Sequence, residues 1–214
     1  MLLLVLAKDL GSALILFVIY VVMSYAALKK WYILPVAGGV VMLAMLVAGK
    51  LMTHVSNRII AWLDPVSTID NQGYQVSQSL FAIGTGGWVG SGLFQGRSST
   101  IPVVTKDFIF SAIVEEMGAL VGISLILICL SVVFLFFRIA RELRDEFYVY
   151  VSVGFGTAYA FQVFLTIGGC IKLIPSTGVT LPLVSYGGSS ILATFMEFSI
   201  VESLYMTTKK RDSR

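Results

Sequence analysis

Apolar residues in this chain gather into five long runs that are separated by more polar segments. Each run is about twenty residues long or longer, which is the length an α-helix needs to cross a bilayer. The third run is the longest, so its helix is expected to tilt or to begin outside the hydrocarbon. The pattern predicts an all-α, polytopic transmembrane helical bundle with spans at residues 10–28, 32–52, 108–137, 148–170 and 187–206.

Two connections between these spans carry patterns of their own. The longer one, residues 53–107, begins with NRIIAWLD (57–64), whose apolar stripe suits a helix lying at the membrane interface. Asp64-Pro65 is expected to end this helix, because the residue before a proline avoids the helical region. The second connection, residues 172–190, holds two prolines and three glycines in a mostly uncharged stretch, which predicts a re-entrant loop.

Composition places the chain among integral membrane proteins. Of its 214 residues, 57% are hydrophobic and only 13% are charged, whereas soluble domains have roughly 25% charged residues. The net charge of +3 is therefore no sign of nucleic-acid binding. Cys129 and Cys170 lie in apolar runs, where a thiol behaves as a small hydrophobe, and the sequence shows neither a disulfide framework nor metal-ligand spacing.

The basic residues predict how the chain is oriented in the membrane. Nine of the fifteen Lys and Arg lie in three short segments, which follow the first, third and fifth spans. With five spans these segments share one side, and the positive-inside rule assigns that side to the cytoplasm. Residues 207–214 are then a cytoplasmic tail, and residues 53–107 a large extracellular loop. An outside N-terminus without a cleavable signal further predicts that residues 1–214 form the C-terminal half of a larger membrane domain.

Three carboxylates stand at places where a membrane protein tolerates charge poorly. Asp107 lies at the mouth of the third apolar run, and Glu115 and Glu116 lie within it. Ionisable groups at bilayer depth are costly unless they are compensated, so they are functional candidates. Two interpretations are open: Asp107 caps a helix N-terminus while the glutamates face a polar seam, or Asp107 takes part in chemistry.

Two groups of neutral polar residues are candidate ligand contacts. Gln75 and Gln78 precede a glycine-rich run at residues 84–96; glutamine amides suit sugar hydroxyls, and glycines allow close approach of the backbone to a ligand. The alternative, a flexible polar loop, leaves the apolar residues interleaved there unexplained. GGSS at residues 187–190 opens the last span, where exposed helix amides bind anions such as phosphate, although a simple capped helix start fits it as well.

Four segments occur in an order that matches a known family. They are NRIIAWLDP, GYQVSQSLFAIGTGGWVGSGL, KDFIFSAIVEEMG and IPSTGVTLPLVSYGGSS, and the opening KDLGSA is similar to the family's K-Q-P-D-L-G-T-A with its proline replaced. In this order they resemble the SEDS family of shape, elongation, division and sporulation proteins (RodA, FtsW and SpoVE). Its members have ten spans with a large extracellular loop between the seventh and eighth, so this chain resembles spans six to ten.

The resemblance implies an enzyme of the bacterial cytoplasmic membrane. Such proteins polymerise lipid II, the undecaprenyl-pyrophosphate-linked disaccharide pentapeptide, during elongation, division or sporulation. They contact membrane lipid and usually work with a class B penicillin-binding protein. The family's catalytic aspartate corresponds to Asp107, in agreement with the need for a base that takes a proton from the acceptor sugar. The alternatives are a lipid II flippase, which needs no base, and an inactive fragment that serves as a scaffold.

The remaining candidate residues follow from the substrate. Its pyrophosphate requires cations, which Lys8, Arg58, Arg97 or a divalent ion such as Mg²⁺ or Mn²⁺ could supply. The family's L-P-E-x-H-T-D-F-I-F is altered here, because Val103 replaces the glutamate and Lys106 precedes the aspartate. This lysine either keeps the aspartate ionised or contacts pyrophosphate itself. The expected substrate contacts are Lys8, Arg58, Gln75, Gln78, Arg97, Lys106, Ser185, Gly187, Gly188 and Ser189.

Asp9, Glu115 and Glu116 are expected to be structural or coupling residues. If a helix begins at Asp107, Glu115 lies eight residues further along, which is about 12 Å on the axis, and Glu116 lies near the opposite face. Paired glycosidase carboxylates are about 5 to 9.5 Å apart. A direct partnership between Asp107 and either glutamate is therefore not expected.

The first testable prediction concerns topology. Single cysteines introduced at Ser98 and Ser176 should react with a membrane-impermeant thiol reagent in intact cells, because both positions are expected outside. A cysteine at Ser213 should react only after lysis. Labelling at Ser213 before lysis would contradict the orientation argued from the basic segments.

Overall fold

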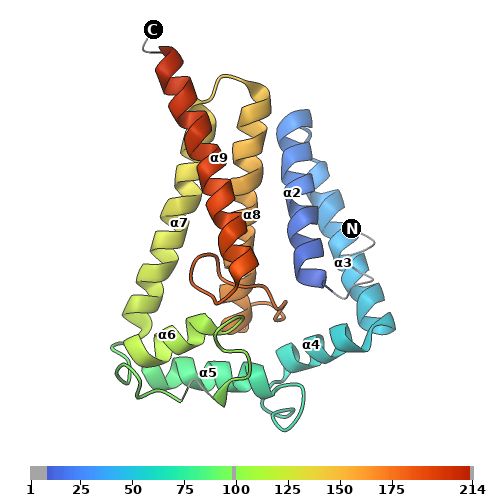
Figure 1. Cartoon of the computed structure of the whole chain (residues 1–214). Coiled ribbons are helices and arrows are strands. Elements are labelled where there is room, and N and C mark those ends of the chain that lie inside the picture. Colours follow the sequence, from blue (N-terminus) through green and yellow to red (C-terminus); the bar gives the residue numbers. More distant parts are fainter. Residues whose placement is uncertain (1–8, 98–99, 213–214) are drawn as a thin grey trace.

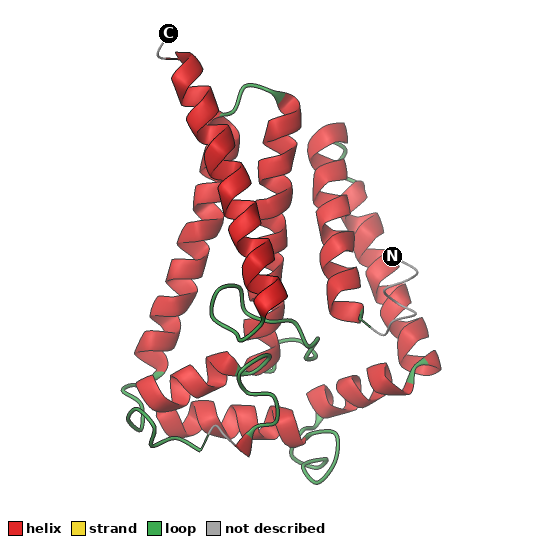
Figure 2. Ribbon diagram, viewed as in Figure 1, coloured by secondary structure: helices red, strands yellow, loops and turns green. Residues whose placement is uncertain are grey.

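The computed structural model describes residues 9–97 and 100–212 of the chain. Within these ranges it is helical, with eight helices and no strand. Figures 1 and 2 show two upright groups of helices, α2 with α3 and α7 with α8 and α9, standing on a layer of shorter helices, α4, α5 and α6. The all-α bundle predicted from the apolar runs is confirmed.

In the described part of the chain, four helices are long and apolar enough to cross a membrane: α2 (Leu10–Leu28), α3 (Ile33–Leu51), α7 (Ala119–Glu142) and α8 (Glu146–Cys170). These correspond to four of the five predicted spans. The fifth forms α9 (Gly188–Asp212), which has the necessary length. Glu197 and Glu202 lower its hydropathy, so α9 is not among these four.

The third apolar run is not one helix, and here the prediction was wrong. It is divided at Gly118 into the short α6 (Ile109–Met117) and the spanning α7. Gly118 has φ of 88°, and a Cβ there would lie 2.4 Å from the carbonyl oxygen of Trp88. The amide of Ala119 donates to the carbonyl of Gly87 at 2.9 Å, so the start of α7 is held by the chain that follows α5. Glu115 and Glu116 consequently lie on α6 and not within a span.

The layer of short helices confirms one prediction and extends another. Helix α4 (Thr53–Leu63) ends at Asp64 as expected. The segment that follows contains a further helix, α5 (Tyr74–Gly86), which packs along α6. Two glycines of the glycine-rich run make this packing possible: a Cβ on Gly86 would lie 2.0 Å from the Val114 carbonyl oxygen, and one on Gly90 2.3 Å from that of Glu116. At these positions glycine serves close contact within the chain.

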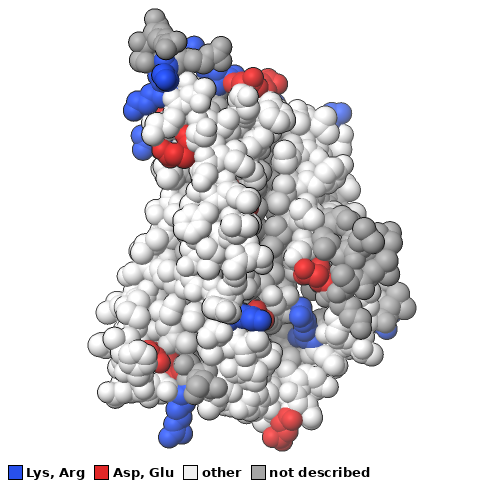
Figure 3. Space-filling model, in the orientation of Figure 1, with Lys and Arg blue, Asp and Glu red and all other residues white. Residues whose placement is uncertain are grey.

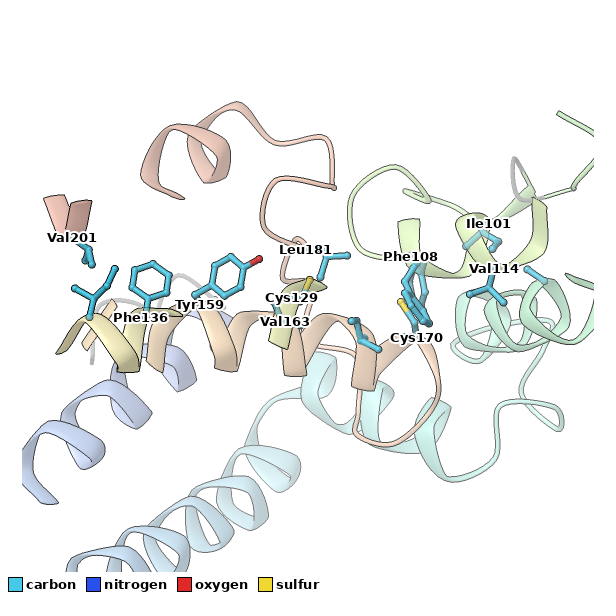
Figure 4. Close-up of a cluster of buried hydrophobic side chains, with 14 of the residues drawn as sticks. Ile101, Phe108, Val114, Cys129, Phe136, Tyr159, Val163, Cys170, Leu181 and Val201 are labelled. Carbon is cyan, nitrogen blue, oxygen red and sulfur yellow. The ribbon is translucent and has the colours of Figure 1, made fainter. Parts of the chain in front are cut away.

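The buried core joins the upright helices to the lower layer. Figure 4 shows its side chains running from Val201 and Phe136, past Tyr159, to Phe108 and Cys170 near α6. Phe108 is only 1% exposed and Cys170 is fully buried. Since Phe108 directly follows Asp107, this packing fixes the backbone beside the candidate carboxylate.

The three basic segments lie at one end of the molecule, as the charge pattern predicted. The α2–α3 turn, the α7–α8 turn and the end of α9 lie together at the top of Figure 1, opposite the layer of short helices. Figure 3 shows charged atoms mainly towards the two ends, with a broad uncharged belt between them. The distribution suits a bilayer around the upright helices.

Gly118 provides the second testable prediction. Gly118→Ala should lower thermal stability, because alanine is strained at this φ and its Cβ would meet backbone atoms of Trp88 and Val89. The expected loss is about 1–3 kcal/mol, measured by thermal unfolding in detergent. Gly38→Ala on α3 is the matched control, since Gly38 has no atom within 4 Å of its Cβ position. Equal stability of both variants would contradict this account of the α6–α7 break.

Candidate active site

Asp107 lies in the loop that leads into α6, with its side chain half-buried. The N-cap of α6 is Phe108, and no side chain forms a capping hydrogen bond there. The interpretation of Asp107 as a helix cap is therefore wrong. Its carboxylate instead points towards chain segments that are distant in sequence.

Arg58 and Asp107 meet at the backbone of Gly178. A Cβ built on Gly178 would lie 3.3 Å from Arg58 Nη2 and 3.7 Å from Asp107 Oδ2. Arg58 also donates from Nη1 to the carbonyl oxygen of Thr177 at 2.9 Å. Three segments thus converge here: α4, the loop before α6, and the loop between α8 and α9. A side chain at position 178 would occupy the space between the cation and the carboxylate.

Burial and charge act in opposite directions on Asp107. Desolvation raises the pKa of its carboxyl above the ordinary value, and the positive charges of Arg58 and Lys106 oppose that rise. A carboxylate with a raised pKa is a stronger base when ionised. Lys106 is exposed, so its charge remains available to a ligand beside Asp107.

Ser185, an expected substrate contact, holds the loops that carry the site together. It is only 3% exposed. Its hydroxyl accepts from the amide of Leu181 at 2.8 Å and donates to the carbonyl oxygen of Lys106. The amide of Tyr186 donates to the Thr105 carbonyl at 2.8 Å. The α8–α9 loop is thereby fastened to the segment that ends at Asp107.

A second, buried hydrogen-bond network contacts the backbone carbonyl of Asp107. The Ser79 and Ser111 hydroxyls are hydrogen-bonded to each other, and Ser79 also donates to the Cys170 carbonyl at 2.9 Å. The Cys170 thiol donates to the carbonyl of Asp107 at 3.3 Å. Helices α5, α6 and α8 are linked in this way directly behind the carboxylate.

The two glutamates of α6 hold the loop that follows α5. Glu115 is 3% exposed, and its Oε1 accepts from the backbone amide of Arg97 at 2.8 Å. Glu116 Oε2 accepts from the amide of Phe94 at 3.1 Å. Both contacts agree with the structural role expected for these residues. The Arg97 side chain itself is exposed.

The other expected contacts are not gathered at Asp107. Gln75 and Gln78 lie half-buried on α5, which packs mainly along α6. Lys8 lies outside the described residues. The contacts at Gly178 therefore single out Arg58 among the expected cations, while the charge of Lys106 acts on Asp107.

Asp9 and the GGSS segment meet at a separate cavity of about 340 Å³ between α2, α8 and α9. Asp9 caps α2, accepting from the amide of Ser12 at 3.1 Å. Gly187 directly precedes α9, Gly188 begins it, and Ser189 lines the cavity. Gly178 lines it too, so the cavity adjoins the place where Arg58 and Asp107 meet.

An apolar groove reaches the same place from the membrane side. It has a volume of about 540 Å³ and lies between α2, α3 and α4. Most of its lining residues are apolar, and Arg58 and Thr177 also line it. An apolar chain in this groove would end beside a guanidinium.

The donor set does not fit a divalent ion held by the protein. Within the described part of the chain, no three His, Cys, Asp or Glu side chains come together. Asp107 faces two cationic side chains, which disfavour a further cation beside it. The positive charge that this arrangement offers a ligand comes from Arg58 and Lys106.

Two contributors were missed by the sequence reasoning. Gly178 lies in the segment IPSTGVTLPLVSYGGSS and Gln162 lies in the fourth apolar run, but neither was predicted to be part of a site. Gly178 has a positive φ of 77° and lies between two prolines of the loop. A glycine in such a loop can indicate that another part of the protein or a ligand approaches the backbone closely. Gln162 in the middle of a span was a polar residue at membrane depth, which is itself a functional signal.

Sequence comparison supplies the family. Residues 1–210 match the family described as "Cell cycle protein", which comprises FtsW, RodA and SpoVE. The chain belongs to this family. It is 39% identical over 195 residues to "Peptidoglycan glycosyltransferase RodA" of Mycobacterium tuberculosis (strain ATCC 25618 / H37Rv), covering 91% of this chain and 41% of that protein. With "Probable peptidoglycan glycosyltransferase FtsW" of Francisella salina it shares 36% identity over 197 residues, which is 89% of this chain and 48% of the relative.

A solved structure agrees with the assignment. It is described as "Structural coordination of polymerization and crosslinking by a peptidoglycan synthase complex", and it matches with a TM-score of 0.75 and 27% identity. The match covers 95% of this chain and 57% of the solved one. The chain spans about half the length of the curated relatives it matches, and its family and apolar helices make it a membrane protein.

Ser185 generates the third testable prediction. Ser185→Ala should accelerate hydrogen exchange at the Leu181 amide by about tenfold or more, since losing a buried hydrogen-bond partner costs about 1–3 kcal/mol. Ser199→Ala is the control, because the Ser199 hydroxyl bonds only to the Phe195 carbonyl of its own helix. Unchanged exchange at Leu181 would show that Ser185 does not fasten the loops.

Proposed function

We propose that this chain carries the reaction centre of a peptidoglycan glycosyltransferase that polymerises lipid II. The observation that carries the proposal is the meeting of Arg58 and Asp107 at Gly178, with Lys106 next to Asp107 in the chain. The names of the RodA and FtsW relatives support it. The activity belongs to the intact protein, of which relatives twice this length are examples.

In the proposed reaction Asp107 is the general base. The carboxylate takes the proton from the acceptor sugar hydroxyl. At the same time the oxygen of that hydroxyl forms a bond to the anomeric carbon of the donor. The bond from that carbon to pyrophosphate breaks, and the electron pair leaves with the pyrophosphate. Arg58 and Lys106 are the groups that meet this negative charge, and a guanidinium suits phosphate oxygens because it presents donors in a fixed fork.

The apolar groove gives the lipid a place in this scheme. A polyprenyl chain lying between α2, α3 and α4 would bring its pyrophosphate to Arg58. The substrate's apolar and charged parts would thus meet matching surfaces within one continuous path. A flippase would use the same path, but transport makes no use of a base with a raised pKa.

The proposal includes the setting of the enzyme. The relative solved as a peptidoglycan synthase complex supports a partner that cross-links glycan strands, for which a class B penicillin-binding protein is the proposed type. The basic end of the molecule is proposed to face the bacterial cytoplasm, with Asp107 on the outer side.

The fourth testable prediction removes the base. Asp107→Asn in the full-length protein should lower the rate of lipid II polymerisation at least about 100-fold, the scale of general base catalysis. The protein should keep its thermal stability, because Asp107 caps no helix. Asp70→Asn, an exposed position between α4 and α5, is the control. Glycan chains of normal length from the Asp107 variant would refute the catalytic role.

The fifth prediction concerns pH. Asp107 must be ionised to act as a base, so activity should fall as the pH drops through its raised pKa. Arg58→Gln removes a charge that lowers this pKa, so the acid limb of the kcat/KM profile should move to higher pH. Arg58→Lys keeps the charge and should leave the acid limb near its original position. An acid limb unaffected by Arg58→Gln would mean that another group titrates.

A further inference from the structure

The cavity beside Gly178 is lined by acidic and neutral polar residues, in contrast to the neighbouring place where Arg58 meets Asp107. It is bounded by the start of α2, the middle of α8, the loop at residues 178–180 and the first half of α9. Gln162 is fixed in its wall, since its amide nitrogen donates to the Thr180 carbonyl at 2.9 Å and to Ser190 Oγ at 3.3 Å. Besides Gln162, the polar lining includes Asp9, Ser12, Ser189, Ser190, Thr194 and Glu197.

The charge of this lining decides between ligand classes. Asp9 and Glu197 both line the cavity, and no Lys or Arg does so among the described residues. Ser189 at the start of α9 shares the same wall, so any attraction of the helix N-terminus for phosphate is opposed by two carboxylates. Hydroxyls, an amide and carboxylates together suit a neutral ligand rich in hydroxyl and amide groups.

The position of the cavity relates it to the proposed reaction. Gly178 contributes to the cavity wall and also lies beside both Arg58 Nη2 and Asp107 Oδ2. A ligand in the cavity would therefore lie next to the base, where none of the described lining residues is a cation. Its volume of about 340 Å³ is near the lower end of ligand pockets, about 300–1,000 Å³, which suits a single sugar ring better than a whole lipid-linked disaccharide.

We propose that this cavity binds the acceptor's terminal N-acetylated sugar. Glu197 accepts hydrogen bonds from the hydroxyl and amide groups of this sugar, and the Ser189 hydroxyl donates to it. The inference rests on the proposed glycosyltransferase function. It divides the substrates by chemistry: pyrophosphate lies with Arg58 and Lys106, and the neutral acceptor sugar lies with the carboxylates and hydroxyls. Glu197 is then a residue that positions the acceptor, and Asp107 remains the base.

The test uses the full-length protein and Glu197→Gln, with Ser189→Ala as a second variant at an exposed position. Each should raise the KM for lipid II about tenfold, which corresponds to the loss of about 1.4 kcal/mol of binding, with kcat changed less than twofold. Each should also weaken binding of a soluble, neutral disaccharide of two N-acetylglucosamine units while leaving binding of undecaprenyl pyrophosphate unchanged. Arg58→Gln should show the opposite pattern with the two probes.

Glu202→Gln is the matched control, because Glu202 lies on the same helix but lines a groove between α7 and α9. It should behave as wild type with both probes. Wild-type polymerisation with unchanged KM in both cavity variants would overturn the acceptor site and leave the glycosyltransferase proposal intact. Displacement of the disaccharide by NaCl or by a soluble amine would also overturn it, since it would identify a cation site. Absence of polymerisation by the wild-type protein would instead refute the proposed function.

Discussion

The site depends on how the α8–α9 loop satisfies its backbone polar groups among apolar helices. Residues 171–187 form no helix, so their amides and carbonyls need partners from elsewhere in the protein. Side chains of α8 provide some of them: Thr166 donates to the Val179 carbonyl at 2.9 Å and Gln162 to that of Thr180. Ser185 then fastens the loop to the Lys106 carbonyl. These hydrogen bonds also hold the loop in place, and Gly178 of this loop lies beside Asp107.

This arrangement explains how a small number of charges can meet in a mostly apolar protein. Arg58 reaches the loop through the Thr177 carbonyl, and the absence of a side chain on Gly178 leaves room for both Arg58 and Asp107. The carboxyl of Asp107 is half-buried, which raises its pKa, and the charges of Arg58 and Lys106 oppose that rise. The α8–α9 loop lies beside the Arg58 guanidinium of α4, and the same loop lines a cavity together with the Glu197 carboxylate of α9.

Several features of this architecture could be predicted from residues alone, and the failures have identifiable causes. The end of α4 at Asp64 follows from the proline after it, which acts locally. The break at Gly118 was missed because apolar residues lie on both sides of it, and its cause is the contact with Trp88, thirty residues earlier. The part that Ser185 plays in fastening the loops was missed for a similar reason, since one of its partners, Lys106, lies in another segment.

The sequence by itself determined the membrane class, most of the spans and the common side of the basic segments, and it singled out Asp107 as the candidate base. These are properties of local length, composition and order along the chain, which tertiary contacts do not alter. Only the tertiary structure decided that Arg58, Asp107 and Gly178 meet, and that Asp9 and Glu197 share one cavity. Such groups are brought together by packing across long sequence separations, and packing of that kind leaves no periodic signal in the chain.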